Sequence, residues 1–281
     1  MDIVKPRQQQ IWRWPAVLNF TLGSMGAGYF VWTWLDVFLA VNAVGPVGEG
    51  HAGVVAAGLI LGGFFALLFE AGNPLKSYLT FLNVRHSWMS RELWLAMIFV
   101  GLVGFDLVYP DWLPLWIPAV TAFLFVMSQA FIIYRSRAIR AWNVWPVVPL
   151  LILTGLSSGF GLFLLLEWDG DQGSTLLLLG GATWLICLGA LLYYLFGFGF
   201  QDTDFRADTR SLRTPGALLV GTGVGLVLPF ALLAMVTGGL MGSYAGPAIT
   251  LAGAAAILGA ALRNRNIVMK AGYFRRIGID L

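Results

Sequence analysis

Long apolar segments dominate this chain of 281 residues. They run approximately from Ala16 to Asn42, Ala52 to Ala71, Glu92 to Tyr109, Trp112 to Tyr134, Pro146 to Glu167, Ser174 to Phe200, Gly216 to Thr237 and Ala248 to Leu262. A helix needs about 20 apolar residues to cross the hydrocarbon core of a bilayer, because no backbone polar group can be left unpaired in lipid. The pattern therefore predicts an all-α integral membrane protein with eight transmembrane helices.

Composition excludes several other classes of protein. Hydrophobic residues make up 58% of the chain and charged residues only 11%, whereas about a quarter of the residues of a soluble domain are charged. A net charge of +3 spread over such a chain gives no basic patch for nucleic acid. The single cysteine, Cys187, excludes a disulfide scaffold and an iron–sulfur cluster held by this chain alone.

The basic residues fix the predicted orientation. All 17 lysines and arginines fall in the two tails or in every second connection between the apolar segments: Lys5, Arg7, Arg13; Lys76, Arg85, Arg91; Arg135, Arg137, Arg140; Arg206, Arg210, Arg213; Arg263, Arg265, Lys270, Arg275, Arg276. The remaining connections contain Glu49, Asp111, Glu167, Asp169 and Asp171 and no basic residue. Because basic connections stay on the cytoplasmic side, we expect an inner-membrane protein with both termini in the cytoplasm.

This topology divides the chain into five parts. We expect a cytoplasmic tail at 1–15, a four-helix bundle at 16–134, a cytoplasmic connection at 135–145, a second four-helix bundle at 146–262 and a basic cytoplasmic tail at 263–281. The longer connections, Gly72–Arg91 and Gln201–Pro215, both lie on the cytoplasmic side. A soluble partner would therefore dock there, although a basic face also binds anionic lipid headgroups.

Polar and ionisable side chains gather at the cytoplasmic ends of the first four predicted spans, where such groups are costly and usually functional. They are Asn19, Glu70, His86, Arg91, Glu92 and Gln129. This arrangement suits a lipid-soluble quinone, whose reduction requires two protons and therefore a carboxylate that exchanges them. We predict Glu70 and Glu92 as the proton-exchanging catalytic groups, and Asn19, His86, Arg91 and Gln129 as quinone-binding groups.

Some of these residues have structural alternatives. Glu92 resembles the acid of a capping box behind Ser87 or Ser90, and Arg91 resembles an anchor that reaches the membrane surface. The fifth span contains small polar residues at helical spacing, which suit helix packing as well as ligand binding. These are Thr154, Ser157 and Ser158.

Histidine usage restricts the redox chemistry. A b-type haem in a helical bundle usually takes two axial histidines or one histidine with a methionine. The chain has two histidines, His51 and His86, and the predicted topology places them on opposite sides of the membrane. No spacing of cysteine, histidine and carboxylates indicates a zinc site. We expect no haem, cluster or metal in this chain.

Three segments carry a family likeness. They read NFTLGSMGAGYFVW in the first span, FEAGNPLKSYLTFLNVRHSWMSREL after the second, and AWNVWPVVPLLILTGLSSGFG in the fifth. With eight spans and no haem ligands, the chain resembles the NrfD-like membrane-anchor subunits of molybdenum or tungsten oxidoreductases, the polysulfide reductase and dimethyl sulfoxide reductase anchor family. The last segment is similar to anchors of phenylacetyl-CoA:acceptor oxidoreductases.

One position departs from the family pattern. Dimethyl sulfoxide reductase anchors have a histidine-x-glycine-x-proline pattern after the second span, followed by a serine-rich helix start with a glutamate. Glu92 matches that glutamate, and Glu70 occupies the histidine position. The substitution keeps a proton-exchanging group but changes its charge.

The resemblance implies a complex of several subunits. A large catalytic subunit would hold a molybdenum or tungsten pterin, and a ferredoxin-like subunit would hold iron–sulfur clusters. This chain would bind quinone or quinol near the closest cluster, and we expect its partners on the cytoplasmic face.

Two further classes of function remain open. One is a secondary transporter or proton-conducting subunit that uses Asp36, Asp106, Glu70 and Glu92. Such transporters often have two related halves, but Pro146, Pro149 and Pro229 in the second half have no counterparts in the second and third spans. The other is a purely structural anchor, which would leave Glu70 unexplained.

Overall fold

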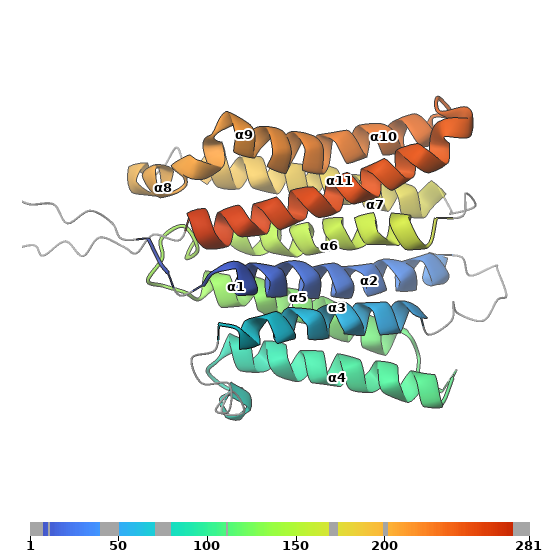
Figure 1. Ribbon diagram of the computed structural model, residues 1–281, viewed down its shortest axis with the longest axis horizontal. Helices are drawn as coiled ribbons and strands as arrows, with labels where there is room; N and C mark the ends of the chain where they lie inside the picture. The colour runs from blue at the N-terminus through green and yellow to red at the C-terminus, as the bar shows by residue number, and fades with distance from the viewer. Residues whose placement is uncertain are drawn as a thin grey trace, which may run out of the picture.

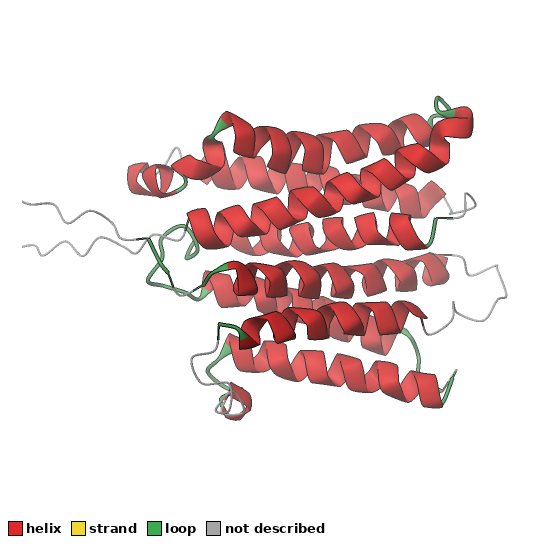
Figure 2. Cartoon of the chain, in the orientation of Figure 1, coloured by secondary structure: helices red, strands yellow, loops and turns green. Residues whose placement is uncertain are grey.

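A computed structural model describes residues 8–10, 12–39, 51–70, 80–110, 112–168, 174–198 and 202–271. Within these ranges the chain is all-α, with no β-strand (Figure 2). The helices lie side by side along the longest axis of the molecule (Figure 1).

The helices of the first half follow the predicted segments. The first rod consists of α1 (Trp14–Leu18), a π-helical segment (Asn19–Gly23) and α2 (Ser24–Leu39). It is followed by α3 (His51–Leu68), α4 (Trp88–Val108) and α5 (Trp116–Tyr134).

The second half contains further π-helical segments. Its long elements are α6 (Val147–Leu166), α7 (Ser174–Leu192) with a π-helical end (Tyr193–Gly197), α9 (Pro215–Leu218) leading through a π-helical segment (Leu219–Val227) into α10 (Leu228–Thr237), and α11 (Ala245–Arg265) with a π-helical end (Asn266–Lys270). Short helices lie at Thr203–Asp208 (α8), Arg210–Arg213 and Gly242–Tyr244. The last long helix thus continues past Leu262, where we expected the span to end.

Six helices in the described part of the chain are long and apolar enough to cross a membrane: His51–Leu68, Trp116–Tyr134, Val147–Leu166, Ser174–Gly197, Pro215–Thr237 and Gly242–Lys270. The first rod and α4 have comparable lengths but are more polar, and α4 contains Arg91, Glu92 and Asp106. The chain is therefore a multi-pass all-α membrane protein.

The two halves of the chain meet along α2 and α6, which lie next to each other in the middle of the molecule (Figure 1). Glycines make this approach possible. A Cβ atom at Gly159 would lie 2.3 Å from the carbonyl carbon of Gly28, and one at Gly28 would lie 2.6 Å from the oxygen of Gly155. Gly155 and Gly159 form a GxxxG pattern, which allows close backbone packing of membrane helices. The two predicted bundles thus share one continuous interface.

The described basic residues lie at one end of the helices, here called the basic end. They are Arg13, Arg85, Arg91, Arg135, Arg137, Arg140, Arg206, Arg210, Arg213, Arg263, Arg265 and Lys270. At the opposite end α3 begins at His51 and α6 ends before Glu167. The remaining basic residues and both chain termini lie outside the described residues.

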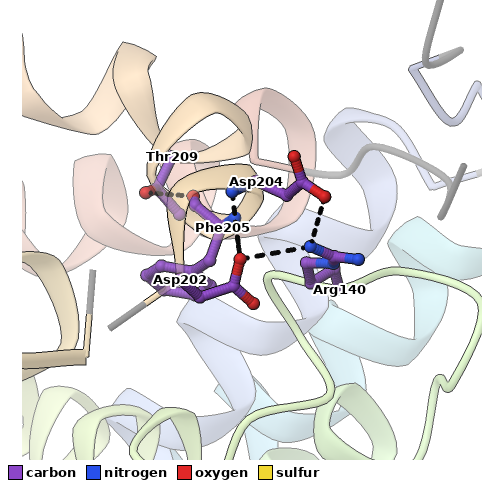
Figure 3. A network of polar contacts seen from close by, with 5 residues as sticks. All are labelled: Arg140, Asp202, Asp204, Phe205 and Thr209. Atoms are coloured by element: carbon purple, nitrogen blue, oxygen red, sulfur yellow. Dashed lines mark hydrogen bonds and ion pairs between the residues drawn. The ribbon is translucent and has the colours of Figure 1, made fainter. Parts of the chain in front are cut away.

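Connections at the basic end are tied together by polar contacts. Arg140 forms ion pairs with Asp202 (3.1 Å) and Asp204 (2.8 Å), as Figure 3 shows. Asp202 also caps α8 by accepting hydrogen bonds from the backbone N–H groups of Asp204 and Phe205. These contacts fix α8 against the connection between α5 and α6.

Candidate functional site

A cavity of about 670 Å³ lies near the basic end, between the first rod, α3 and α4. Its wall is mostly aromatic and aliphatic, with contributions from Phe20, Phe64 and Leu93. Four polar residues line it, namely Asn19, Glu70, Thr80 and Glu92. An apolar cavity with a few convergent polar groups is the usual form of a small-molecule site.

Glu92 is the most deeply buried acidic residue of this cavity, with an exposed fraction of 3%. Its Oε1 accepts two hydrogen bonds of 2.9 Å, from Asn19 Nδ2 and from Gln129 Nε2. Gln129 Nε2 also lies 3.2 Å from the backbone oxygen of Asn19. Three residues that we predicted for the site from their shared membrane depth are therefore in direct contact.

Local backbone geometry makes this contact possible. Asn19 begins the π-helical segment Asn19–Gly23, a conformation that is frequently found at functional sites. On the neighbouring helix, a Cβ atom at Gly63 would lie 2.9 Å from Asn19 Oδ1. Gly23 likewise leaves room for the side chain of Gln129, whose Nε2 would lie 2.9 Å from an added Cβ. Small residues thus shape the space around the two amides.

The structure rejects the capping role that we considered for Glu92. Ser87 is the N-cap of α4 and accepts a hydrogen bond from the backbone N–H of Ser90 (3.4 Å). The hydroxyl of Ser90 in turn donates to the backbone oxygen of Thr80. Glu92 follows these residues in α4, and its carboxylate accepts hydrogen bonds from Asn19 and Gln129 of other helices.

Glu70 lies in the turn after α3 and lines the same cavity as Glu92. Its Oε1 accepts a hydrogen bond from the backbone N–H of Arg13, the residue that precedes α1. A negative charge at a helix N-terminus is favourable, so this contact also fixes the start of the first rod. The Gly-Asn-Pro sequence after Glu70 lies outside the described residues.

His86 and Arg91 are not among the residues that line the cavity. His86 is exposed in the turn before α4. Arg91 donates to the backbone oxygens of Val84 (3.0 Å) and Arg85 (2.8 Å), and its guanidinium lies 4.3 Å from the ring centroid of Trp88. These contacts stabilise the turn before α4.

Trp12 is a cavity residue that sequence reasoning did not select, because it falls within the predicted tail 1–15. Its ring packs on Phe20 (5.7 Å between centroids) and Trp142 (5.2 Å). The indole N–H of Trp142 donates to the oxygen of Ile267 (2.8 Å). The tryptophans of the IWRWP segment were the available signal, since tryptophan is enriched at membrane interfaces.

A second polar group occupies the opposite end. Glu167 Oε1 accepts a hydrogen bond from the hydroxyl of Tyr29 and lies 2.9 Å from Nε2 of His51. Tyr29 of α2 is fully buried, whereas the side chain of His51 is half exposed. This contact connects α2, α3 and α6 at that end. His51 and His86 therefore belong to opposite ends of the molecule.

The buried hydroxyls of α6 lie in helix interfaces. Ser158 donates to the oxygens of Thr154 and Gly155 in its own helix, and Thr154 Oγ1 lies 3.8 Å from Cys187 Sγ. Ser157 Oγ has no hydrogen-bond partner among the described residues. Asp36 and Asp106 are half-buried and have interaction partners. Within the described part of the chain, no group of three or more histidine, cysteine or acidic side chains is arranged to hold a metal ion.

No family model matches the chain, and a comparison with curated proteins finds no match. Function therefore has to follow from the cavity and its side chains. The arrangement combines a large apolar space with a buried carboxylate held by two amides, and with a second carboxylate at the end of α3. It can bind an apolar molecule with a polar head and exchange protons with that head.

Proposed function

We propose that this chain is the quinone-binding membrane-anchor subunit of a molybdenum or tungsten oxidoreductase complex in the inner membrane. The six apolar helices, together with Trp14–Leu39 and α4, would give eight transmembrane helices. The basic end would face the cytoplasm because every described lysine and arginine lies there.

The observation that carries this proposal is the apolar cavity that contains Glu92. Its volume of about 670 Å³ is in the range of ordinary ligand sites, roughly 300–1,000 Å³. Three lining residues of α3, Leu61, Phe65 and Leu68, are 51%, 62% and 46% exposed. In a bilayer these side chains contact lipid, so a lipid-soluble ligand can reach the cavity from the side.

The protein side chains would provide proton exchange and orientation. A bound quinone supplies a pair of carbonyl groups that takes up two electrons and two protons. Glu92 would exchange a proton with the nearer carbonyl oxygen, since it is the buried carboxylate of the cavity. Glu70, which is only partly buried at the end of α3, would exchange protons with water at the basic end.

The same geometry supports a partner at the basic end. Trp12 forms part of the cavity wall and packs against Trp142 of the connection between α5 and α6. That connection carries the exposed Arg135 and Arg137. A ferredoxin-like iron–sulfur subunit docked on this side would therefore lie close to the cavity, with the large catalytic subunit attached to it.

The test is quinone turnover in the purified complex with the variants Glu92→Gln and Glu70→Gln. Asp204→Asn is the matched control, because this carboxylate is paired with Arg140, outside the cavity. Loss of a positioned proton-exchanging group should slow turnover by about 10²-fold or more, with normal assembly of the subunits. Turnover equal to that of Asp204→Asn in both variants would overturn the assignment. A chain that purifies alone and moves protons in liposomes would instead favour the transporter alternative.

A further inference from the structure

We infer that Asn19 and Gln129 are positioning residues that fix the carboxylate of Glu92, and are not ligands of the bound quinone. This inference rests on the proposed function. It replaces the quinone-binding role that the sequence predicts for Asn19 and Gln129.

The first observation is that both amides converge on one oxygen. Asn19 Nδ2 and Gln129 Nε2 each lie 2.9 Å from Glu92 Oε1. This leaves Oε2 as the oxygen that Glu92 can present to a ligand. Two donors from two different helices hold a carboxylate in one orientation much better than one donor does, because rotation of the group would break both bonds.

The second observation is that both amide oxygens are buried in the protein. Asn19 Oδ1 and Gln129 Oε1 are both buried and have no hydrogen-bond partner among the described residues. Asn19 Oδ1 lies against Gly63 of α3, and Gln129 lies outside the residues that line the cavity. Both N–H groups of Gln129 are therefore engaged, and neither amide oxygen is an accessible acceptor for a molecule in the cavity.

The third observation is that Asn19 and Gln129 also contact each other. Gln129 Nε2 also lies within hydrogen-bond distance of the backbone oxygen of Asn19, at the start of the π-helical segment. The π-helical segment, the glutamine of α5 and the glutamate of α4 thus form one unit. Its function is to keep Glu92 at a defined distance and angle, which proton transfer requires.

The test is a double-mutant cycle in the purified complex. Asn19→Leu and Gln129→Met remove the donors with little change in volume, and each is made with Glu92 and with Glu92→Gln. If the amides act through Glu92, each variant lowers kcat by about tenfold with little change in KM. In the Glu92→Gln background the same substitutions should then have almost no further effect. A direct quinone ligand would give the opposite result, a raised KM and an undiminished effect without Glu92, and this would overturn the inference.

Three further variants control for packing. Ser128→Ala is matched to Gln129→Met, because it removes a neighbouring buried hydroxyl that donates to the oxygen of Phe125 in its own helix (2.7 Å). It should leave kcat unchanged. Gly63→Ala would push on Asn19 Oδ1 and on the Asn19 backbone, whereas Gly62→Ala meets only a carbon of Leu22 at 3.9 Å. Gly63→Ala should reproduce the effect of Asn19→Leu, and Gly62→Ala should not. Equal effects of the two glycine variants would overturn the inference.

A spectroscopic readout separates this inference from the proposed function. In pH-induced infrared difference spectra, the carboxyl C=O band that disappears in Glu92→Gln belongs to Glu92. Asn19→Leu and Gln129→Met should shift this band, and Ser128→Ala should not. If the complex turns over no quinone, the proposed function fails while the band still tests the positioning role. An unshifted band in both amide variants would overturn that role.

Discussion

Gly28 of α2 and Gly159 of α6 bring the backbones of two helices into direct contact. A Cβ atom at Gly159 would lie 2.3 Å from the carbonyl carbon of Gly28 and 2.4 Å from the nitrogen of Tyr29. Since α2 belongs to the half of the chain with the cavity and α6 to the other half, this contact joins the two halves. It also fixes the height of the first rod, which carries Asn19.

The substitution Gly159→Ala should therefore destabilise the protein. The added methyl group meets backbone, which cannot rotate away, so we expect a loss of about 1–3 kcal/mol, typical of overpacking. The control is Gly189→Ala in α7, where no atom lies within 4 Å of an added Cβ. Thermal unfolding in detergent measures both variants. A Gly159→Ala protein as stable as the Gly189→Ala protein would contradict the close contact.

Tyr29→Phe should weaken the opposite end of the molecule. The hydroxyl of this buried tyrosine donates to Glu167, and hydrogen bonds to charged groups contribute about 1.5–3 kcal/mol. His51→Ala removes a contact whose imidazole is 50% exposed, so it should cost less, about 0–1 kcal/mol. Thermal unfolding of the two variants gives the order. A larger loss for His51→Ala would show that the exposed member dominates this group.

Asp202→Ala should loosen α8 more than Asp204→Ala does. Asp202 pairs with Arg140 and also caps the helix through two backbone N–H groups, whereas the Asp204 side chain contributes only the ion pair (Figure 3). Loss of an N-cap costs about 1 kcal/mol, and a partly exposed ion pair contributes about 0–1 kcal/mol. Hydrogen exchange of the α8 amides measures the difference. Equal exchange in both variants would mean that the cap contributes nothing.

The depth of the site could be predicted from the sequence, whereas its contacts could not. The alternation of basic and acidic connections places Asn19, Glu92 and Gln129 at the same end of different helices, and the structure brings these three together. Which helix faces turn toward one another could not be predicted, because apolar residues lie on every face of α3, α6 and α11 and form no distinct stripe. A helix without an apolar stripe gives no signal of its buried face.

The same reasoning explains the positions of His86 and Trp12. His86 has the right depth but lies in an exposed turn, since the serine-capped start of α4 comes after it. Trp12 comes before the first apolar segment, yet it lines the cavity because Gln9 binds the backbone oxygens of Trp12 (2.8 Å) and Val268 (3.1 Å). Hydropathy does not report such long-range contacts. The π-helical segment at Asn19 likewise has no signature in hydropathy.

The last prediction concerns Arg263, which we expected in the basic cytoplasmic tail at 263–281. In the structure it lies inside the last turn of α11 and is only 3% exposed. Its Nη1 donates to the oxygen of Gly221 (2.8 Å), while Nε and Nη2 have no hydrogen-bond partner among the described residues. Burial of a charge without such partners is costly.

Arg263→Met should therefore stabilise the protein, by about 1 kcal/mol or more, because an apolar chain of similar length replaces a buried guanidinium. The gain is reduced by the hydrogen bond to Gly221, which contributes about 1 kcal/mol. Arg265→Met is the control, since Arg265 is exposed and its substitution should change stability by less than about 0.5 kcal/mol. Thermal unfolding in detergent at equal lipid content measures both. A stability of Arg263→Met below that of the unsubstituted protein would contradict this prediction.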